Sequence, residues 1–182
     1  DDLGRIVLVG DFDSFNGLKH GGIVRVLSDG RLDDSFDAGS GANGAITGII
    51  EEWDGSHIVV GSFDSFNGVS VPGVARLESD GKLDAEFLGM LPAISGQAAG
   101  VQLQDDGRIL LVGEFGIAIG EGDLAKRYTN IVRLNRNGSV DESFQPDLAK
   151  RSPSEHLDGP VSAIAIQPDG RIILGGSFSS IN

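Results

Sequence analysis

A short segment recurs four times along the chain, and this repeat constrains the fold more than any other feature. Each copy begins with Gly, continues with a run rich in Val, Ile and Leu, and ends with Gly, one further residue and Phe. The copies are GRIVLVGDF (4–12), GSHIVVGSF (55–63), GRILLVGEF (107–115) and GRIILGGSF (170–178). We expect a series of similar units that share a core, because one unit cannot bury its own apolar face.

Two further segments recur in a fixed order around the first. IVRVLSDGRLDDSF (23–36), VARLESDGKLDAEF (74–87) and IVRLNRNGSVDESF (131–144) follow three of its copies, and AITGIIEEWDG (45–55), AAGVQLQDDG (98–107) and VSAIAIQPDG (161–170) precede three of them. The short apolar runs are bounded by Gly, Asp and Asn, which predicts strands joined by hairpin turns. No segment has a convincing helical pattern. Residues 98–107 come closest, but the equivalent segments are β-branched and alternating, which favours a strand there too.

The segment PDGRIILGGSF (168–178), together with NIVRLNRNGSVDESF (130–144), resembles the delta-60 repeat. This is a bacterial tandem repeat that is grouped with β-propeller-like domains of unknown function. The resemblance covers nearly the whole chain. It implies an all-β fold of four-stranded antiparallel blades, in large proteins that are mostly secreted or attached to the cell surface and have no established catalytic activity. The chain departs from the pattern at residues 116–130, which replace a shorter DSFNG loop.

The repeat predicts the organisation of the chain as one repeat domain. We expect a partial blade at 1–44, a blade at 45–97, a blade with insertions at 98–160 and half a blade at 161–182. The second strand of the unit occurs at both ends, so closing a ring of three blades would leave one copy spare. We therefore expect an incomplete ring, continued in missing sequence or completed by a partner chain in a homo-oligomer.

Side chains that recur in every unit are expected to be structural. All nine phenylalanines lie in or directly after the repeats and are predicted to form the core: Phe12, Phe63, Phe115, Phe178, Phe36, Phe87, Phe144, Phe15 and Phe66. Three arginines each precede an aspartate by eight residues: Arg25 and Asp33, Arg76 and Asp84, Arg133 and Asp141. This spacing spans one hairpin and predicts an ion pair, or hydrogen bonds from Asp to backbone, that hold the last strand. Paired catalytic carboxylates would instead need unequal environments.

Composition and missing motifs exclude several classes of function. The net charge of −13 argues against nucleic-acid binding, and no apolar run is long enough for direct membrane insertion. There is no cysteine for disulfides or thiolate metal sites, and the three histidines have no metal-ligand spacing and are expected to be solvated. No hydrolase, zinc-protease or nucleotidase motif is present. GSGANG (39–44) matches a dinucleotide fingerprint but precedes a predicted strand rather than a helix. We therefore expect neither an enzyme nor a cofactor.

The stretch VGDFDSFNG (9–17) resembles part of a calcium-binding loop. Its would-be ligands vary between units, since Asp11 is replaced by Ser62, Glu114 and Ser177. A metal site common to all units is therefore not expected, although a weak ion site at Asp13 or Asp64 stays open. Asn16 and Gly17 are instead predicted to form a left-handed bend.

Features that occur outside the period are the candidates for binding. DLAKR occurs at 123–127 and again at 147–151, which places basic side chains in predicted loops beside the single tyrosine: Lys126, Arg127, Tyr128, Lys150 and Arg151. The single tryptophan, Trp53, could stack on a sugar, but a half-buried position at a strand end is favoured. Two functions fit. One is binding or adhesion to a protein or glycan by a secreted or cell-surface bacterial protein. The other is a structural spacer that assembles with copies of itself by strand pairing.

Overall fold

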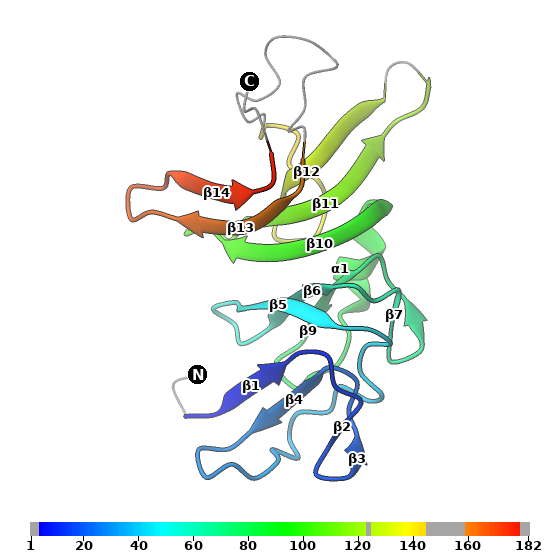
Figure 1. The fold of residues 1–182 in the computed structure, drawn as a ribbon, viewed down its shortest axis with the longest axis vertical. Helices are drawn as coiled ribbons and strands as arrows, with labels where there is room; N and C mark the ends of the chain where they lie inside the picture. Colours follow the sequence, from blue (N-terminus) through cyan, green and yellow to red (C-terminus); the bar gives the residue numbers. More distant parts are fainter. Residues whose placement is uncertain (1–3, 123–124, 145–158, 179–182) are drawn as a thin grey trace. The chain divides into compact units, whose positions relative to one another are not determined.

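The computed structural model describes residues 4–122, 125–144 and 159–178. The chain divides into two compact units, Asp1–Leu88 and Gly89–Asn182 (Figure 1). Small antiparallel sheets follow one another along the chain, which confirms the predicted all-β class of tandem blades.

The unit Asp1–Leu88 contains two of the predicted blades. Its first sheet pairs β1 (Ile6–Val9) with β4 (Ile23–Val26). Its second sheet has the order β5-β6-β9, with β5 (Ile46–Glu51), β6 (His57–Gly61) and β9 (Val74–Leu77). The DSFNG loops form two small hairpins: β2 (Ser14–Phe15) with β3 (Leu18–Lys19), and β7 (Ser65–Phe66) with β8 (Val69–Ser70).

The unit Gly89–Asn182 contains a three-stranded sheet followed by a two-stranded sheet among its described strands. Its first sheet has the order β10-β11-β12, with β10 (Ile94–Leu103), β11 (Ile109–Ile119) and β12 (Lys126–Leu134). The second pairs β13 (Val161–Ile166) with β14 (Ile172–Gly176). The segment 98–107 is thus a strand and turn, as predicted. Strand β10 begins at Ile94 and therefore crosses the expected blade boundary between residues 97 and 98.

The turns between strands explain why the DG dipeptides recur. Gly55, Gly107 and Gly170 have positive φ angles of 81°, 79° and 80°. In each turn the carboxylate of the preceding aspartate accepts a hydrogen bond from the backbone N–H two residues later, as Asp106 does from Arg108 at 3.1 Å. This side-chain bond and the left-handed glycine together fix the reversal of the chain.

The expected fourth strand of each blade is reduced to a single bridge. These bridges are Val26 to Leu32, Leu77 to Leu83, and Leu134 to Val140. The chain after each bridge turns away at an aspartate, whose N–H donates to the carbonyl of the repeated arginine at 2.9 Å in all three units.

A short helix, α1 (Ala85–Met90), was not expected. The backbone N–H groups of Glu86 and Phe87 donate to Asp84 Oδ1 at 2.9 and 3.0 Å, so Asp84 caps the helix at its N-terminus. Ala, Glu, Leu and Met then supply residues of high helix propensity. The helix has six residues, and no helix in the described part of the chain is long and apolar enough to cross a membrane.

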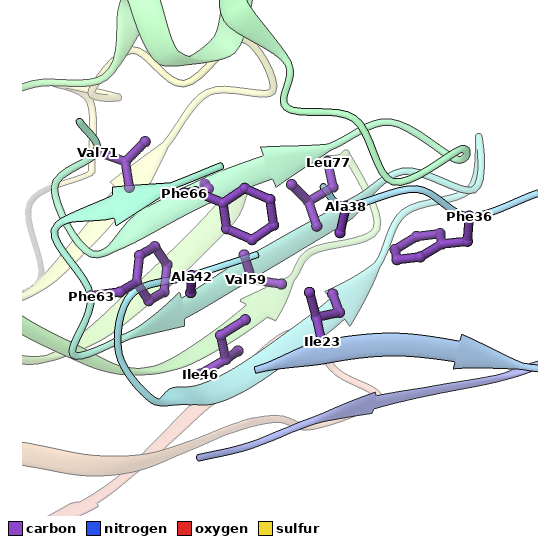
Figure 2. Close-up of a cluster of buried hydrophobic side chains, with 11 residues drawn as sticks. Ile23, Phe36, Ala38, Ala42, Ile46, Val59, Phe63, Phe66, Val71 and Leu77 are labelled. Atoms are coloured by element: carbon purple, nitrogen blue, oxygen red, sulfur yellow. The ribbon is translucent and has the colours of Figure 1, made fainter. Parts of the chain in front are cut away.

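Five of the nine repeated phenylalanines are buried, whereas all nine were predicted to form the core. In Asp1–Leu88, side chains from β4, β5, β6, β7 and β9 and from the intervening loops form one cluster (Figure 2). Phe63 and Phe66 pack edge to face in this cluster, with ring centroids 6.4 Å apart. Five phenylalanines are buried, namely Phe36, Phe63, Phe66, Phe87 and Phe115. The other four, Phe12, Phe15, Phe144 and Phe178, are half-buried.

A repeated glycine marks the point where the first two strands of a unit approach most closely. A methyl group on Gly61 would lie 2.1 Å from the carbonyl oxygen of Ala45, and one on Gly113 would lie 2.2 Å from that of Gln97. The register of the first strand shifts at the same place, between Ile46 and Gly48 and between Ala98 and Gly100. Glycine is thus required here for close backbone contact.

Candidate functional site

The departure from the repeat at residues 116–130 extends the central hairpin of its sheet. Beyond a register shift, Gly116 pairs with Thr129, Ile117 with Tyr128, Ala118 with Arg127 and Ile119 with Lys126. The prediction that Lys126 and Arg127 lie in a loop is therefore wrong, since both lie in β12. The reason is local. β-branched and aromatic residues before and after the turn favour strands, and Gly120 and Gly122 reverse the chain with φ angles of 92° and 62°. Lys150 and Arg151 lie outside the described residues.

One face of this hairpin carries Lys126 and Tyr128. Side chains alternate along a strand, so these two share a face and Arg127 lies on the other. Lys126 donates to the carboxylate of Glu142, which raises the pKa of Lys126 through the hydrogen bond and the opposite charge. Tyr128 is half-buried; burial raises the pKa of its hydroxyl, and the negative charge of Glu142 adds to this effect. Lys126 therefore has its counter-charge within the protein.

The opposite face is hollowed. Ser95, Gly116 and Ala118 have small side chains and share this face with Arg127 and Thr129, because Ser95, Gly116 and Thr129 are direct neighbours across the three strands. A shallow pocket of about 330 Å³ lies against this part of the sheet, and Ile94, Ile117 and Tyr128 also line it. Its walls come from β10, β11, β12 and the residue before β10, and Lys126 takes no part in them.

Arg127 is the cation of this pocket. It is exposed, and it makes no hydrogen bond or ion pair with any residue that the structure describes. Arg25 and Arg133, by contrast, are each paired with an aspartate. A guanidinium presents a planar fork of donors that suits a carboxylate or phosphate. The hairpin thus offers an anion-binding group, without a partner in the described part of the chain, beside a small, largely apolar hollow.

In the first and third copies of the repeat, the repeated arginine lies beside the repeated aspartate. Arg25 Nε donates to Asp33 Oδ2 at 2.7 Å, and Arg133 Nε donates to Asp141 Oδ2 at 2.9 Å. Each guanidinium also lies over the phenylalanine that ends the repeat, 4.8 Å from the ring centroid of Phe36 and 4.6 Å from that of Phe144. Their predicted role is to hold the last part of the unit in place.

Asp33 is held as a carboxylate. The hydroxyl of Ser35 donates to its Oδ1 at 2.6 Å, the backbone N–H of Ser35 donates at 3.0 Å, and Arg25 binds the other oxygen. The Ser35 hydrogen bonds and the Arg25 contact outweigh burial and lower the pKa of Asp33 from 3.8 to about 2. A group with so low a pKa is poorly suited to general acid catalysis near neutral pH.

In the second copy of the repeat, the arginine pairs with a different carboxylate. Arg76 binds Glu52 at 2.7 Å and Asp54 at 3.2 Å, whereas Asp84 lies 3.6 Å away. Glu52 was not predicted as a structural residue. The signal is its repeat position, which is Gln104 in the third unit and Gln167 in the fourth. The third unit retains a weaker version of the same contact, since Arg133 donates to Gln104 Oε1 at 3.4 Å.

His57 is buried, contrary to the expectation that the histidines are solvated. It is only 3% exposed, because it lies within β6, and its ring contacts Phe36 edge-on with centroids 5.9 Å apart. Its Nδ1 is buried without a hydrogen-bond partner among the described residues. Burial lowers the pKa of His57, the nearby Glu51 opposes this, and Arg25 lowers it further. His156 lies outside the described residues.

Acid is expected to destabilise Asp1–Leu88 through His57. Its pKa in the folded state is below 6.5, so the unfolded chain takes up a proton first. The stability that neutral His57 confers is complete above about pH 6.5 and decreases as the pH falls towards the folded pKa. Thermal unfolding monitored by circular dichroism between about pH 7 and pH 5 should show a falling midpoint. His57→Leu should flatten this dependence, and equal slopes for the two proteins would contradict it.

The DSFNG turns adopt the predicted left-handed bend. Asn16 and Gly17 have φ angles of 50° and 80°, and the equivalent Asn67 has 47°. Asp64 accepts a hydrogen bond from the side-chain amide of Asn43 at 2.7 Å. Within the described ranges no group of three or more His, Cys, Asp or Glu side chains is placed to hold a metal ion. A weak ion site at Asp13 or Asp64 stays a prediction.

GSGANG leads into strand β5 and not into a helix, as predicted, and Gly41 lies against the backbone of Gly21 where a side chain would not fit. The half-buried position favoured for Trp53 is wrong. Trp53 is 72% exposed, because it lies in the turn after β5 rather than in the strand.

No curated protein and no solved structure matches this chain. One family does match, in four segments that follow the repeat: residues 4–36, 54–87, 104–144 and 167–182. These segments cover more than half of the chain and contain all four copies of the glycine-to-phenylalanine motif. The chain therefore belongs to the family described as a domain of unknown function (DUF5122) beta-propeller.

Proposed function

We propose that this β-propeller repeat domain is a non-catalytic binding module that attaches a bacterial secreted or surface protein to a protein or glycan ligand. The extended hairpin of β11 and β12 is the binding surface. Arg127 carries the proposal, because it lines the pocket and has no partner among the residues described. The secreted or surface location, and the finer assignment to delta-60 repeats, rest on the sequence resemblance alone.

A binding role agrees with how the repeated carboxylates are used. Asp33 and Asp141 each accept hydrogen bonds from an arginine and a serine, and these contacts lower the pKa of both. They are therefore ionised supports of the fold rather than a pair with split pKa values. Binding sites on repeat folds commonly lie on segments that depart from the repeat. The 116–130 hairpin is such a segment.

Shortening this hairpin tests the proposal. Residues 116–130 can be replaced by DSFNGVSVPG, which is segment 64–73. In the second copy of the repeat, this segment joins the same two strands that residues 116–130 join in the third. The chimera should keep its far-UV circular dichroism and a cooperative unfolding transition. It should lose binding on arrays of glycans and surface proteins to which the parent chain binds. Binding retained by a folded chimera would contradict the proposal.

A structural role in assembly is the second candidate, and exposed strand edges favour it. Among the described strands, β1 pairs with β4 alone and exposes Ile6 (53%) and Leu8 (39%). On β14, Ile173 is 52% exposed. Unpaired edges with apolar side chains invite strand addition from another copy, which would complete the ring. Native mass measurement of the parent chain and the chimera distinguishes the two functions, since ordered oligomers in both, without any ligand, would favour assembly.

A further inference from the structure

We infer that the pocket beside Arg127 takes a sugar residue that carries a single carboxylate, such as a uronic or sialic acid. This inference rests on the proposed function, because it assumes that the extended hairpin is the binding surface. It adds the chemical class of the ligand. Three properties of the pocket lead to it: one cation without a partner among the described residues, no carboxylate in the walls, and hydroxyl groups beside small apolar side chains.

The cation indicates an anionic group on the ligand. Arg127 lines the pocket and makes no ion pair with the residues described, whereas its neighbour Lys126 is bound by Glu142 on the opposite face. A guanidinium binds a carboxylate through two parallel hydrogen bonds, which gives orientation as well as energy. The ligand is thus expected to place its carboxylate against Arg127.

The charge of the rest of the molecule limits the ligand to one such group. Arg127 is the single charged residue in the pocket wall, and the chain as a whole has a net charge of −13. A polyanion would meet one favourable contact and many repulsive ones, since its affinity depends on a cluster of cations. A ligand with one carboxylate avoids this repulsion.

The remaining wall fits a sugar better than an amino acid. No carboxylate lines the pocket, so the ammonium group of an amino acid would have no counter-charge. Ser95 donates to the carbonyl of Gly116 at 3.1 Å and so keeps its oxygen free to accept, and Thr129 adds a second hydroxyl. Such groups suit the alternating donors and acceptors of sugar hydroxyls. The volume of about 330 Å³ lies at the lower end of small-ligand sites and favours a single ring.

Calorimetric titration with defined sugars tests this inference. The probes are methyl glucuronide and the methyl glycoside of N-acetylneuraminic acid, with methyl glucoside as the neutral counterpart of the first. At least one acidic sugar should bind, and the neutral sugar should bind at least about tenfold more weakly. Arg127→Gln should lose at least about tenfold in affinity for that sugar. Lys126→Gln removes the same charge from the adjacent residue and should leave the affinity unchanged.

Each other outcome has a distinct meaning. Equal binding of the acidic and neutral sugars, or equal losses in the Arg127→Gln and Lys126→Gln variants, would overturn the assignment of a carboxylate to Arg127. If no sugar binds while the hairpin chimera still loses binding on the arrays, the inference fails and the proposed function stands. If the chimera keeps its array binding, the proposed function itself fails.

Discussion

Gly61→Ala is expected to lower the free energy of unfolding of Asp1–Leu88 by about 3–5 kcal/mol, which places it among the most damaging single substitutions. The added methyl group would lie 2.1 Å from the carbonyl oxygen of Ala45 and 3.0 Å from the Cα of Ile46. Both contacts are with backbone, which cannot move aside without separating β5 from β6. Urea unfolding followed by circular dichroism should show an earlier transition or none.

The repeat supplies a matched control at the same position. Gly10 is the equivalent glycine of the first unit, and a methyl group there would meet only the ring of Phe12, at 3.6 Å. Gly10→Ala should therefore change stability by less than about 1 kcal/mol, and reduced freedom of the unfolded chain would favour the variant. If Gly61→Ala proved as stable as Gly10→Ala, the close approach of the first two strands would not be the reason for the glycine.

This pair of glycines shows what the sequence could and could not reveal. The recurrence of Gly10, Gly61, Gly113 and Gly176 predicts a structural requirement, and the alternating runs around them predict strands. The cause of the requirement is the backbone of a neighbouring strand. This cause cannot be deduced from the motif itself. The motif is the same around Gly61, which lies against a neighbouring backbone, and around Gly10, which does not.

The missed features depend on neighbours that are remote in sequence or on a competing local signal. Burial of His57 follows from its contact with Phe36 across the core, which no local pattern encodes. The sequence did contain a signal for helix α1, since Asp84 is followed by residues of high helix propensity, but the repeated pattern predicts strands joined by turns in this segment. The burial of His57 and the capping of helix α1 by Asp84 thus depend on features that the repeat pattern does not contain.

The candidate site was predicted in part. Its departure from the repeat identified the segment that contains Arg127. The strand pairing of that segment was not predicted, because the segment replaces the shorter DSFNG loop of the other repeats and therefore predicts a loop. The distinction between Arg127 and Lys126 needed the structure. It depends on which face of β12 each side chain occupies and on the position of Glu142.

Asp33→Ala is expected to cost about 3 kcal/mol of stability, because it removes one partner of a buried ion pair. The side chains of Arg25 and Asp33 are only 4% and 7% exposed. Without Asp33 the guanidinium would stay buried, held by the carbonyl of Ser79 at 2.8 Å and by Ser35 at 3.1 Å, with no counter-charge in direct contact. Urea unfolding at neutral pH measures the loss.

Asp84→Ala is the matched variant in the second copy of the repeat. It should lower the free energy of unfolding by only about 1 kcal/mol, the value of a lost helix cap. Arg76 keeps Glu52 and Asp54 as partners, so no buried charge is left alone.

The pH dependence of stability gives a second readout for Asp33. The pKa of Asp33 is lowered from 3.8 to about 2, so its contribution is complete above 3.8 and is lost as the pH falls towards 2. The difference between the parent chain and Asp33→Ala should therefore shrink over that interval. Equal costs for the two alanine variants would mean that the pairing of Arg25 with Asp33 does not stabilise the unit more than the cap at Asp84 does.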